Sequence, residues 1–203
     1  MKASNSNIMN KGEIRSRIRA RKTLLSDSER ASAASGVFEL LEQMAAFIMA
    51  DKVLMYHSLP DELSTREFLD KWHGHKRMYL PRVNGVDLDI LPYERTRTHL
   101  GAFRIEEPDG DDIADVADMD MIVVPAVAYD SLGRRVGRGK GYYDRLLSRT
   151  HAVTVGVAYD FQLVDAFGDY AFDVEEHDVP VDYVITLSLI HISEPTRLRC
   201  ISY

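Results

Sequence analysis

The residues with the clearest chemical potential form a short run in which glycine alternates with basic side chains. Gly137, Gly139 and Gly141 enclose Arg138 and Lys140. Glycine reaches backbone conformations that other residues avoid, so successive amide N–H groups can turn toward one ligand. Two cationic side chains placed between such amides would converge on a phosphate group. The spacing therefore predicts a phosphate-binding loop, with a flexible basic turn as the alternative.

This run differs from the two commonest phosphate motifs. It lacks the Gly-x-x-x-x-Gly-Lys-Ser/Thr pattern, and its third glycine comes one residue too early for the dinucleotide fingerprint. Its position is informative, because it follows the most apolar segment of the chain, 121–128, and precedes a helical pattern. A loop at the carboxyl end of a central strand is where open α/β sheets bind ligands.

Acidic side chains elsewhere could complete such a site. Glu62 ends a polar segment that begins at His57 and follows the apolar run 53–56, so a buried strand delivers it to a loop. Asp144 directly follows the glycine run, and Asp182 precedes the last predicted strand. Taken singly, these three carboxylates also fit ordinary positions at a helix start or a strand edge.

The net charge of −7 is divided unevenly along the chain. Residues 1–30 hold eight Lys and Arg against three acids, a local charge of +5, so the remainder carries −12. Within that remainder, 130–149 is basic again, with six Lys and Arg against two acids. Two basic islands in an acidic chain favour an anionic ligand held between them over a nucleic acid lying on a broad basic face.

Hydrophobic periodicity gives the elements that must position these side chains. Helices are predicted over about 11–25, 28–49 and 65–73, and strands over 53–56, 77–81, 86–91, 121–128, 153–158 and 183–186. Alternating strands and helices predict an α/β layered domain with a mainly parallel sheet, in which 121–128 is central. The stretch 106–120 holds eight acids and no base. We expect it to be a solvated loop with a short helix rather than a metal cluster.

Composition limits the class of protein. The length of 203 residues fits one domain, and 45% apolar with 28% charged residues excludes disordered and fibrous classes. Cys200 is the one cysteine, which excludes an internal disulfide and a cysteine-based zinc cluster. No segment has the length and apolarity of a membrane span, and the start lacks the apolar core of a signal peptide. We therefore expect a cytoplasmic protein.

The basic first helix has a rival interpretation. Its Lys and Arg side chains could contact nucleic acid or a membrane surface, but the acidic remainder of the chain would repel both. We expect neither partner, and we expect a monomer. The side chains assigned to a solvated face of this helix are Arg17, Arg19, Arg21 and Lys22.

Several motifs together resemble a known family. The segment from Arg135 to Asp144, Arg-Val-Gly-Arg-Gly-Lys-Gly-Tyr-Tyr-Asp, resembles the signature of the 5-formyltetrahydrofolate cyclo-ligases, also called methenyltetrahydrofolate synthetases. Lys11 to Arg15 is similar to the family's amino-terminal Lys-x-x-x-Arg, His57 to Glu62 to its folate loop, and His177 to Asp182 to its closing metal motif. The resemblance extends from about Lys11 to Thr186.

This resemblance implies a three-layer α/β/α domain and a ring closure that depends on ATP and Mg²⁺. The formyl oxygen of 5-formyltetrahydrofolate would attack the γ-phosphate of ATP, and N10 would then close on the activated carbon. The products would be 5,10-methenyltetrahydrofolate, ADP and phosphate. Such phosphoryl transfer needs positive charge on the γ-phosphate oxygens, which the basic islands would supply.

The matching positions imply the role of each residue. The ATP-binding residues would be Lys11, Arg15, Arg135, Val136, Gly137, Arg138, Gly139, Lys140, Gly141, Tyr142 and Tyr143, of which Arg138 and Lys140 would be catalytic. Folate would meet His57, Glu62 and Tyr142, and Mg²⁺ would bind Asp144 and Asp182. A tyrosine at a helix start is as often part of the core, so packing inside the domain is the alternative for Tyr142 and Tyr143.

The end of the chain departs from the family pattern. Residues 188–203 continue no motif and resemble translated sequencing-adapter read-through, although a genuine divergent tail is the alternative. We place the domain at 1–187 and expect weak order beyond residue 188. Two other functions remain open, a noncatalytic nucleotide- or folate-binding protein and a sugar-phosphate isomerase that uses the loop as a phosphate clamp.

Overall fold

A seven-stranded sheet forms the centre of the protein in a computed structural model that describes residues 9–95, 98–100, 106–167 and 171–192. Its order is β12-β11-β9-β6-β1-β2-β3. The strands are β1 (Lys52–Leu54), β2 (Arg77–Asn84), β3 (Asp87–Pro92), β6 (Met121–Val124), β9 (Val153–Val157), β11 (Tyr183–Ile185) and β12 (Ile190–Ile192). The four pairings from β2 to β11 are parallel, and only β3 and β12 join antiparallel at the edges. The predicted mainly parallel sheet is confirmed.

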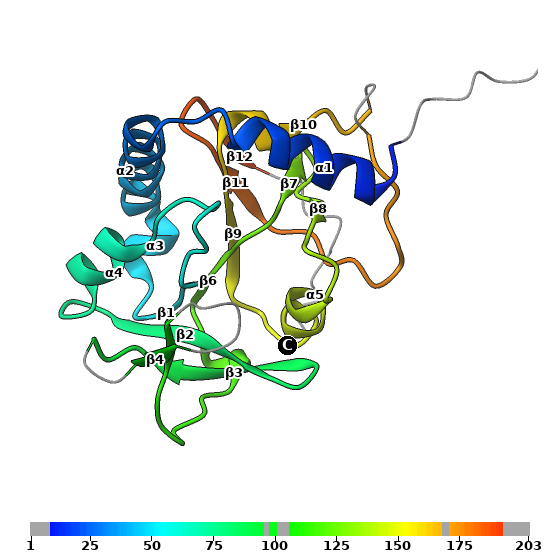
Figure 1. The fold of residues 1–203 in the computed structure, drawn as a ribbon. Helices are drawn as coiled ribbons and strands as arrows, with labels where there is room; N and C mark the ends of the chain where they lie inside the picture. The colour runs from blue at the N-terminus through cyan, green and yellow to red at the C-terminus, as the bar shows by residue number, and fades with distance from the viewer. Residues whose placement is uncertain (1–8, 96–97, 101–105, 168–170, 193–203) are drawn as a thin grey trace, which may run out of the picture.

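Helices cover both faces of this sheet (Figure 1). One face carries α2 (Asp27–Gln43), α3 (Ala45–Met49) and α4 (Arg66–Trp72), and the other carries α5 (Tyr142–Leu147) and the 3₁₀ turn η2 (Val116–Asp118). Alternate residues of β6 explain the two layers, because Met121 and Val123 pack with the first group while Ile122 and Val124 pack with the second. The expected three-layer α/β/α architecture is therefore present.

Helix α1 (Lys11–Lys22) lies outside the main sheet and packs on a small one. That sheet has the order β10-β7-β8, formed by Leu163–Val164, Ala128–Asp130 and Arg135–Val136. Ile14 and Ile18 of α1 are buried against it in a third apolar cluster. The 3₁₀ turn η3 (Asp160–Gln162) precedes β10. Through this packing the amino-terminal helix reaches the start of the glycine run.

Three predicted boundaries are wrong. The helix expected over 28–49 is two helices, because Met44 takes an extended conformation (φ −66°, ψ 131°) between α2 and α3. The strand expected over 121–128 ends at Val124, where Pro125 follows without an N–H for the ladder. The helix expected over 11–25 ends at Lys22.

The acidic stretch contains the expected short helix, η2, together with an unpredicted strand, β5 (Glu106–Pro108), which pairs with β4 (Thr98–Leu100). Its side chains belong to no metal-type cluster in the described part of the chain. Beyond residue 188, Ile190–Ile192 form strand β12, which pairs with β11, and the expectation of weak order in the tail stays a prediction. Two of the three are exposed, and residues 193–203 lie outside the description.

Candidate functional site

A cavity lies where the carboxyl ends of neighbouring parallel strands meet. The chain runs outward from β1 to β3 on one side and from β6 to β12 on the other, so the direction of winding switches between β1 and β6. Loops after β1, β6 and β9 border a small hollow there that is partly open to solvent. It is lined by Lys22, Tyr56, Glu62, Leu63, Pro125, Ala126, Val157 and Gln162. Ligands of open α/β sheets bind at such switch points.

The glycine run connects β8 to α5 beside this cavity. Gly139 (φ 90°) and Gly141 (φ 67°) hold left-handed backbone conformations, which explains why glycine is needed at both positions. The hydrogen bonds found among the described residues use none of the backbone N–H groups of residues 138–141. The loop therefore keeps several donors available for a ligand, as the phosphate-binding prediction requires.

The two basic islands meet at this loop. Arg15 of α1 donates from Nε to the carbonyl oxygen of Gly137 at 2.8 Å. A Cβ added to Gly139 would lie 3.6 Å from Nη2 of Arg15, so the guanidinium also covers the middle of the loop. One turn earlier on the same helix face, Lys11 pairs with Asp178 at 2.6 Å. Asp178, which lies near Glu175 and His177, is therefore already paired with the ammonium group of Lys11.

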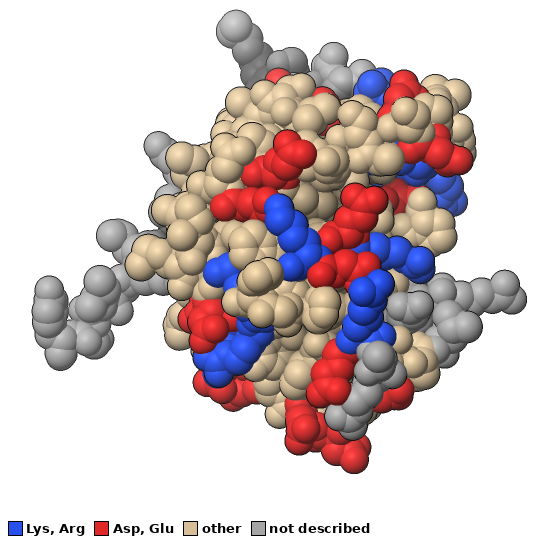
Figure 2. Space-filling model, turned by 90° about the vertical axis from the view of Figure 1, so that its left-hand side faces the viewer, with Lys and Arg blue, Asp and Glu red and all other residues tan. Residues whose placement is uncertain are grey.

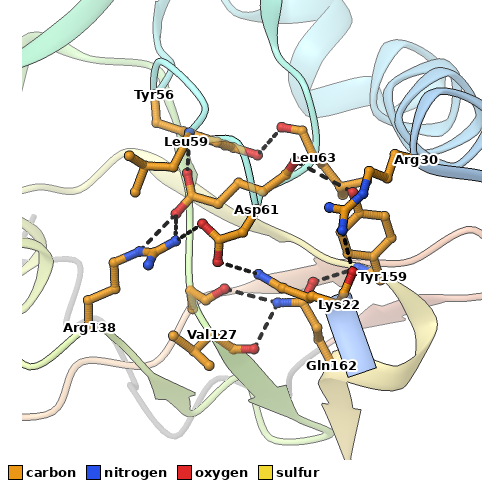
Figure 3. A network of polar contacts seen from close by, with 12 residues as sticks. Lys22, Arg30, Tyr56, Leu59, Asp61, Leu63, Val127, Arg138, Tyr159 and Gln162 are labelled. Carbon is orange, nitrogen blue, oxygen red and sulfur yellow. Dashed lines mark hydrogen bonds and ion pairs between the residues drawn. The ribbon is translucent and has the colours of Figure 1, made fainter. Parts of the chain in front are cut away.

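Arg138 links the glycine loop to the cavity (Figure 3). Its Nη2 donates to Asp61 at 2.6 Å and to Glu62 at 3.0 Å, and its Nε donates to the same Glu62 oxygen at 3.2 Å. The other oxygen of Glu62 accepts from the Leu59 N–H at 3.0 Å, which fixes the carboxylate at the cavity wall. A catalytic candidate and a substrate-binding candidate are thereby in direct contact.

Lys22 occupies a different place from the one expected. We assigned it to a solvated face, but its side chain is only 4% exposed and lines the cavity. It follows Ile14 and Ile18 at intervals of four residues, so it shares their buried helix face. Its Nζ lies 3.5 Å from Asp61 Oδ2. Burial alone would raise the pKa of Asp61, but the charge of Lys22 and the hydrogen bond from Arg138 bring it below its ordinary value.

The two predicted metal ligands each use one oxygen within the protein. Asp144 Oδ1 accepts from Arg135 Nη2 at 2.6 Å and from the Val179 N–H at 3.3 Å. Asp182 Oδ2 accepts from the N–H and the hydroxyl of Thr154, both at 2.8 Å. Within the described ranges the second oxygen of each carboxylate makes no hydrogen bond or ion pair. Mg²⁺ takes one or two carboxylates together with phosphates and waters, so a carboxylate oxygen of this kind suits it. Asp182 lies at the amino end of β11 beside Thr154 of β9, at the opposite edge of the sheet from the cavity.

The remaining predicted residues divide between the core and the surface. Arg135 and Val136 are buried in β8, and Arg135 also donates to the carbonyl of Val179. Tyr143 packs in the second apolar cluster, whereas Tyr142 donates to the Gly85 carbonyl at 3.3 Å. His57 is buried just after β1.

Lys140 differs from these residues because its side chain is exposed. No ion pair to it occurs in the part of the chain that the structure describes. Its ammonium therefore remains available to an anion at the glycine loop.

Sequence reasoning missed three residues near the cavity. Asp61 joins Lys22 to Arg138, and Gln162 donates from Nε2 to the carbonyls of Ala126 and Val127 at 3.1 and 2.7 Å. A signal existed for Asp61, which lies within the polar segment 57–62, and for Lys22 in its spacing from the isoleucines. Nothing in the sequence marks Gln162.

The charge distribution agrees with a small anionic ligand. The face in Figure 2 shows basic and acidic side chains interspersed, with no single continuous basic surface in that view. Among the helices of the described residues, none combines the length and apolarity needed to cross a membrane.

Comparison with known proteins adds an independent finding. Residues 7–187 match the model of the 5-formyltetrahydrofolate cyclo-ligase family. The Escherichia coli K12 enzyme of that name is 33% identical over 153 residues, which cover 70% of this chain and 81% of the relative. The Haemophilus influenzae enzyme is 30% identical, covering 83% and 94%.

Solved structures agree with this match. The NMR structure of Aquifex aeolicus 5,10-methenyltetrahydrofolate synthetase superposes with a TM-score of 0.82 at 32% identity, over 93% of this chain and 95% of that one. The synthetase from Mycoplasma pneumoniae, at 22% identity, shares the fold with a TM-score of 0.69 over 88% and 99% of the two chains.

Proposed function

This chain belongs to the 5-formyltetrahydrofolate cyclo-ligase family, and we propose that it converts 5-formyltetrahydrofolate and ATP into 5,10-methenyltetrahydrofolate, ADP and phosphate. The observation that carries the proposal is the contact between Arg138 and Glu62. It joins a loop suited to phosphate with the cavity that Glu62 lines. A reaction that passes a phosphoryl group from a nucleotide to a bound folate needs this adjacency.

The residues divide the chemistry between them. Arg138 and Lys140 belong to the glycine loop, Arg15 contacts it, and Lys11 lies one turn before Arg15 on α1. Together these four side chains would balance the charge on the γ-phosphate oxygens. The formyl oxygen attacks the γ-phosphorus and ADP leaves. N10 then bonds to the formyl carbon and loses its proton, and the carbon–oxygen bond to phosphate breaks. Because an amide-like oxygen is a weak nucleophile, holding it in line is the main catalytic task.

Glu62 would orient the folate. A pterin presents an N–H and an amino group side by side, and a carboxylate can accept from both in parallel. Its place on the cavity wall supports this role. His57 and Tyr142 are the further candidates for folate contact. Tyr142 begins α5 directly after the glycine loop, and its hydroxyl donates to the Gly85 carbonyl.

Mg²⁺ would be held by Asp144 and Asp182. When bound it would neutralise phosphate charge and help to hold the nucleotide. Protein donors hold one oxygen of each carboxylate in place. Arg135 and the Val179 N–H donate to Asp144, and Thr154 donates to Asp182.

The proposal is tested by mixing the protein with 5-formyltetrahydrofolate, MgCl₂ and ATP and following the ultraviolet absorbance of the methenyl product. We expect a rise that requires both ATP and Mg²⁺, with one phosphate released per product. Folded protein that binds the folate in calorimetry but forms no product would instead be a noncatalytic binding protein. Folded protein that binds neither ligand would contradict the proposal altogether.

A further inference from the structure

One cation in the cavity is used by none of the steps above. Lys22 reaches the cavity from the last turn of α1, seven residues after Arg15. At about 1.5 Å per residue this separates the two residues by roughly 10 Å along the helix. Helix α1 thus has one end at the glycine loop and the other at the cavity, and Lys22 belongs to the cavity end.

The hydrogen bonds of Lys22 are incomplete. An ammonium group has three N–H donors, and the one partner that the described residues give it, Asp61 Oδ2, lies at 3.5 Å, beyond normal hydrogen-bond length. A buried charge is costly unless it is paired, so the unused donors favour an acceptor that arrives with the ligand. Burial lowers the pKa of Lys22 even though Asp61 and Glu62 act to raise it, which agrees with this environment.

The other polar groups of the cavity wall are already bonded. The hydroxyl of Tyr56 donates to the Leu63 carbonyl at 3.1 Å. The amide nitrogen of Gln162 donates to two backbone carbonyls, and its oxygen accepts from the Tyr159 N–H at 3.0 Å. Lys22 is therefore the lining side chain with unused donors. Glu62 keeps capacity as an acceptor on Oε2, which accepts from the Leu59 N–H, while its Oε1 accepts twice from Arg138.

This pair is complementary to one edge of a pterin. Along that edge the 2-amino group and N3–H are donors and the C4 carbonyl oxygen is an acceptor. We infer that Lys22 is a specificity-determining residue that donates to the C4 carbonyl oxygen while Glu62 accepts from the two neighbouring donors; this assignment rests on the proposed function.

The experiment compares two ligands on matched variants. Calorimetry gives Kd for 5-formyltetrahydrofolate and for its 4-amino analogue, in which the C4 oxygen acceptor is replaced by an amino donor and N3 loses its hydrogen; the part of the preference due to Lys22 is the part that changes between wild type and the Lys22 variants. The variants are Lys22→Met, which keeps a long stem without the charge, Lys22→Arg, which keeps donors, and the control Arg19→Met on the exposed side of the same helix. Thermal melts confirm that each variant is folded.

We expect wild type and Arg19→Met to prefer the 4-oxo ligand by about 10- to 100-fold, the usual effect of a hydrogen bond to a charged group. Lys22→Met should lose most of this preference by weaker binding of the 4-oxo ligand, and Lys22→Arg should retain part of it. An unchanged preference in folded Lys22→Met, with turnover still measurable, would overturn the role of Lys22 and leave the proposed function intact. If Lys22→Met fails to fold, an Arg variant with wild-type affinity but no preference would overturn it equally.

Discussion

Arg138 and Glu62 lie 76 positions apart in the chain, yet two N–H groups of the arginine donate to one oxygen of the glutamate, at 3.0 and 3.2 Å. The arginine comes from the glycine loop and the glutamate from the loop after β1. Arg138 is a candidate for contact with the nucleotide phosphate, and Glu62 is a candidate for contact with the folate. Arg138 holds Glu62 and Asp61 through Nε and Nη2, and its Nη1 makes no hydrogen bond among the described residues, so the same guanidinium can meet a phosphate while it holds Glu62.

Replacement of Arg138 should therefore separate binding from catalysis. We expect Arg138→Met to lower kcat by about 100-fold or more, because a cation aimed at transition-state charge is lost. KM for folate should not rise, because Oε1 of Glu62 is then released from Arg138 while Oε2 keeps its bond from the Leu59 N–H. Arg138→Lys should recover only part of kcat, since lysine cannot make two parallel donations. Steady-state rates from methenyl absorbance check both parameters, and a variant with raised KM and normal kcat would contradict the assignment.

Lys140 provides a test in which the fold is hardly disturbed. Its side chain is exposed and makes no ion pair within the described ranges. Lys140→Ala should therefore change the thermal midpoint no more than a typical surface substitution does. Turnover should nevertheless fall by at least about tenfold, because the ammonium would bind the β- or γ-phosphate. Arg149→Ala, at another exposed base past the loop, serves as the control. Wild-type kcat in Lys140→Ala would remove this residue from the site.

Replacement of Asp144 should change both the magnesium dependence of the rate and the stability of the fold. Asp144→Asn keeps an oxygen for the Val179 N–H but removes the charge opposite Arg135, whose side chain is 4% exposed. We expect a destabilisation of about 1–3 kcal/mol from this buried hydrogen-bonded group. The magnesium concentration for half-maximal rate should also rise severalfold.

The matched control for Asp144 is Asp87→Asn, which removes the acid of an exposed ion pair with Arg145. It should change neither the magnesium titration nor, by more than about 0.5 kcal/mol, the free energy of unfolding. A magnesium titration of Asp144→Asn that superposes on that of wild type would show that Asp144 is not a ligand.

The pairing of α1 with the 175–178 segment predicts a pH dependence of stability. Burial acts to raise the pKa of Asp178, but the hydrogen bond from Lys11 and the one from the Glu175 N–H outweigh it, so the pKa lies below the ordinary value. The folded state then binds fewer protons than the unfolded state. Its stabilisation is present above the unfolded pKa, about 4, and is lost as the pH falls through the folded value.

Urea unfolding between pH 3 and pH 7 measures this effect. The free energy of unfolding of wild type should decline below about pH 4, and Asp178→Asn should be less stable at pH 7 and decline less steeply. The exposed Asp111→Asn should follow the wild-type curve. Parallel curves for wild type and Asp178→Asn would show that the Lys11 pair contributes nothing to acid stability.

Much of the architecture follows from local pattern. Apolar runs such as 153–157 have no alternative to a buried strand, and their alternation with helical segments leaves a parallel sheet as the natural arrangement. The meeting of Arg15 with the glycine loop also follows from the two basic islands, since both need the same anion. These inferences use only charge and periodicity, which are readable residue by residue.

The errors arise where distant segments meet. Whether the chain continues past Val124 as one strand depends on Pro125 and on the small sheet that receives Ala128, and that sheet brings together segments far apart in sequence. Lys22 looks solvated by residue type, although its spacing from Ile18 places it inward. Its burial requires the loop after β1 to cover it, and the sequence of α1 contains no information about that loop.

The carboxyl-terminal segment gives the final test, because it pairs with the sheet without entering the core. Strand β12 joins β11 along three residues, and Ile190 and Ile192 remain 42% and 66% exposed. Leu187, by contrast, lies against α2, where a Cβ added to Gly36 would be 2.3 Å from its Cδ1. A chain that ends after Leu189 keeps this contact and the bond from the Thr186 N–H to the Leu189 carbonyl.

We expect this shortened chain to retain kcat and KM. Its free energy of unfolding should fall by no more than about 1 kcal/mol, the scale of exposed edge pairing. It should also aggregate less, because exposed apolar side chains on an edge strand favour association. Light scattering, urea unfolding and the methenyl assay measure the three effects, and loss of folding in the shortened chain would mean that the tail is an integral part of the domain.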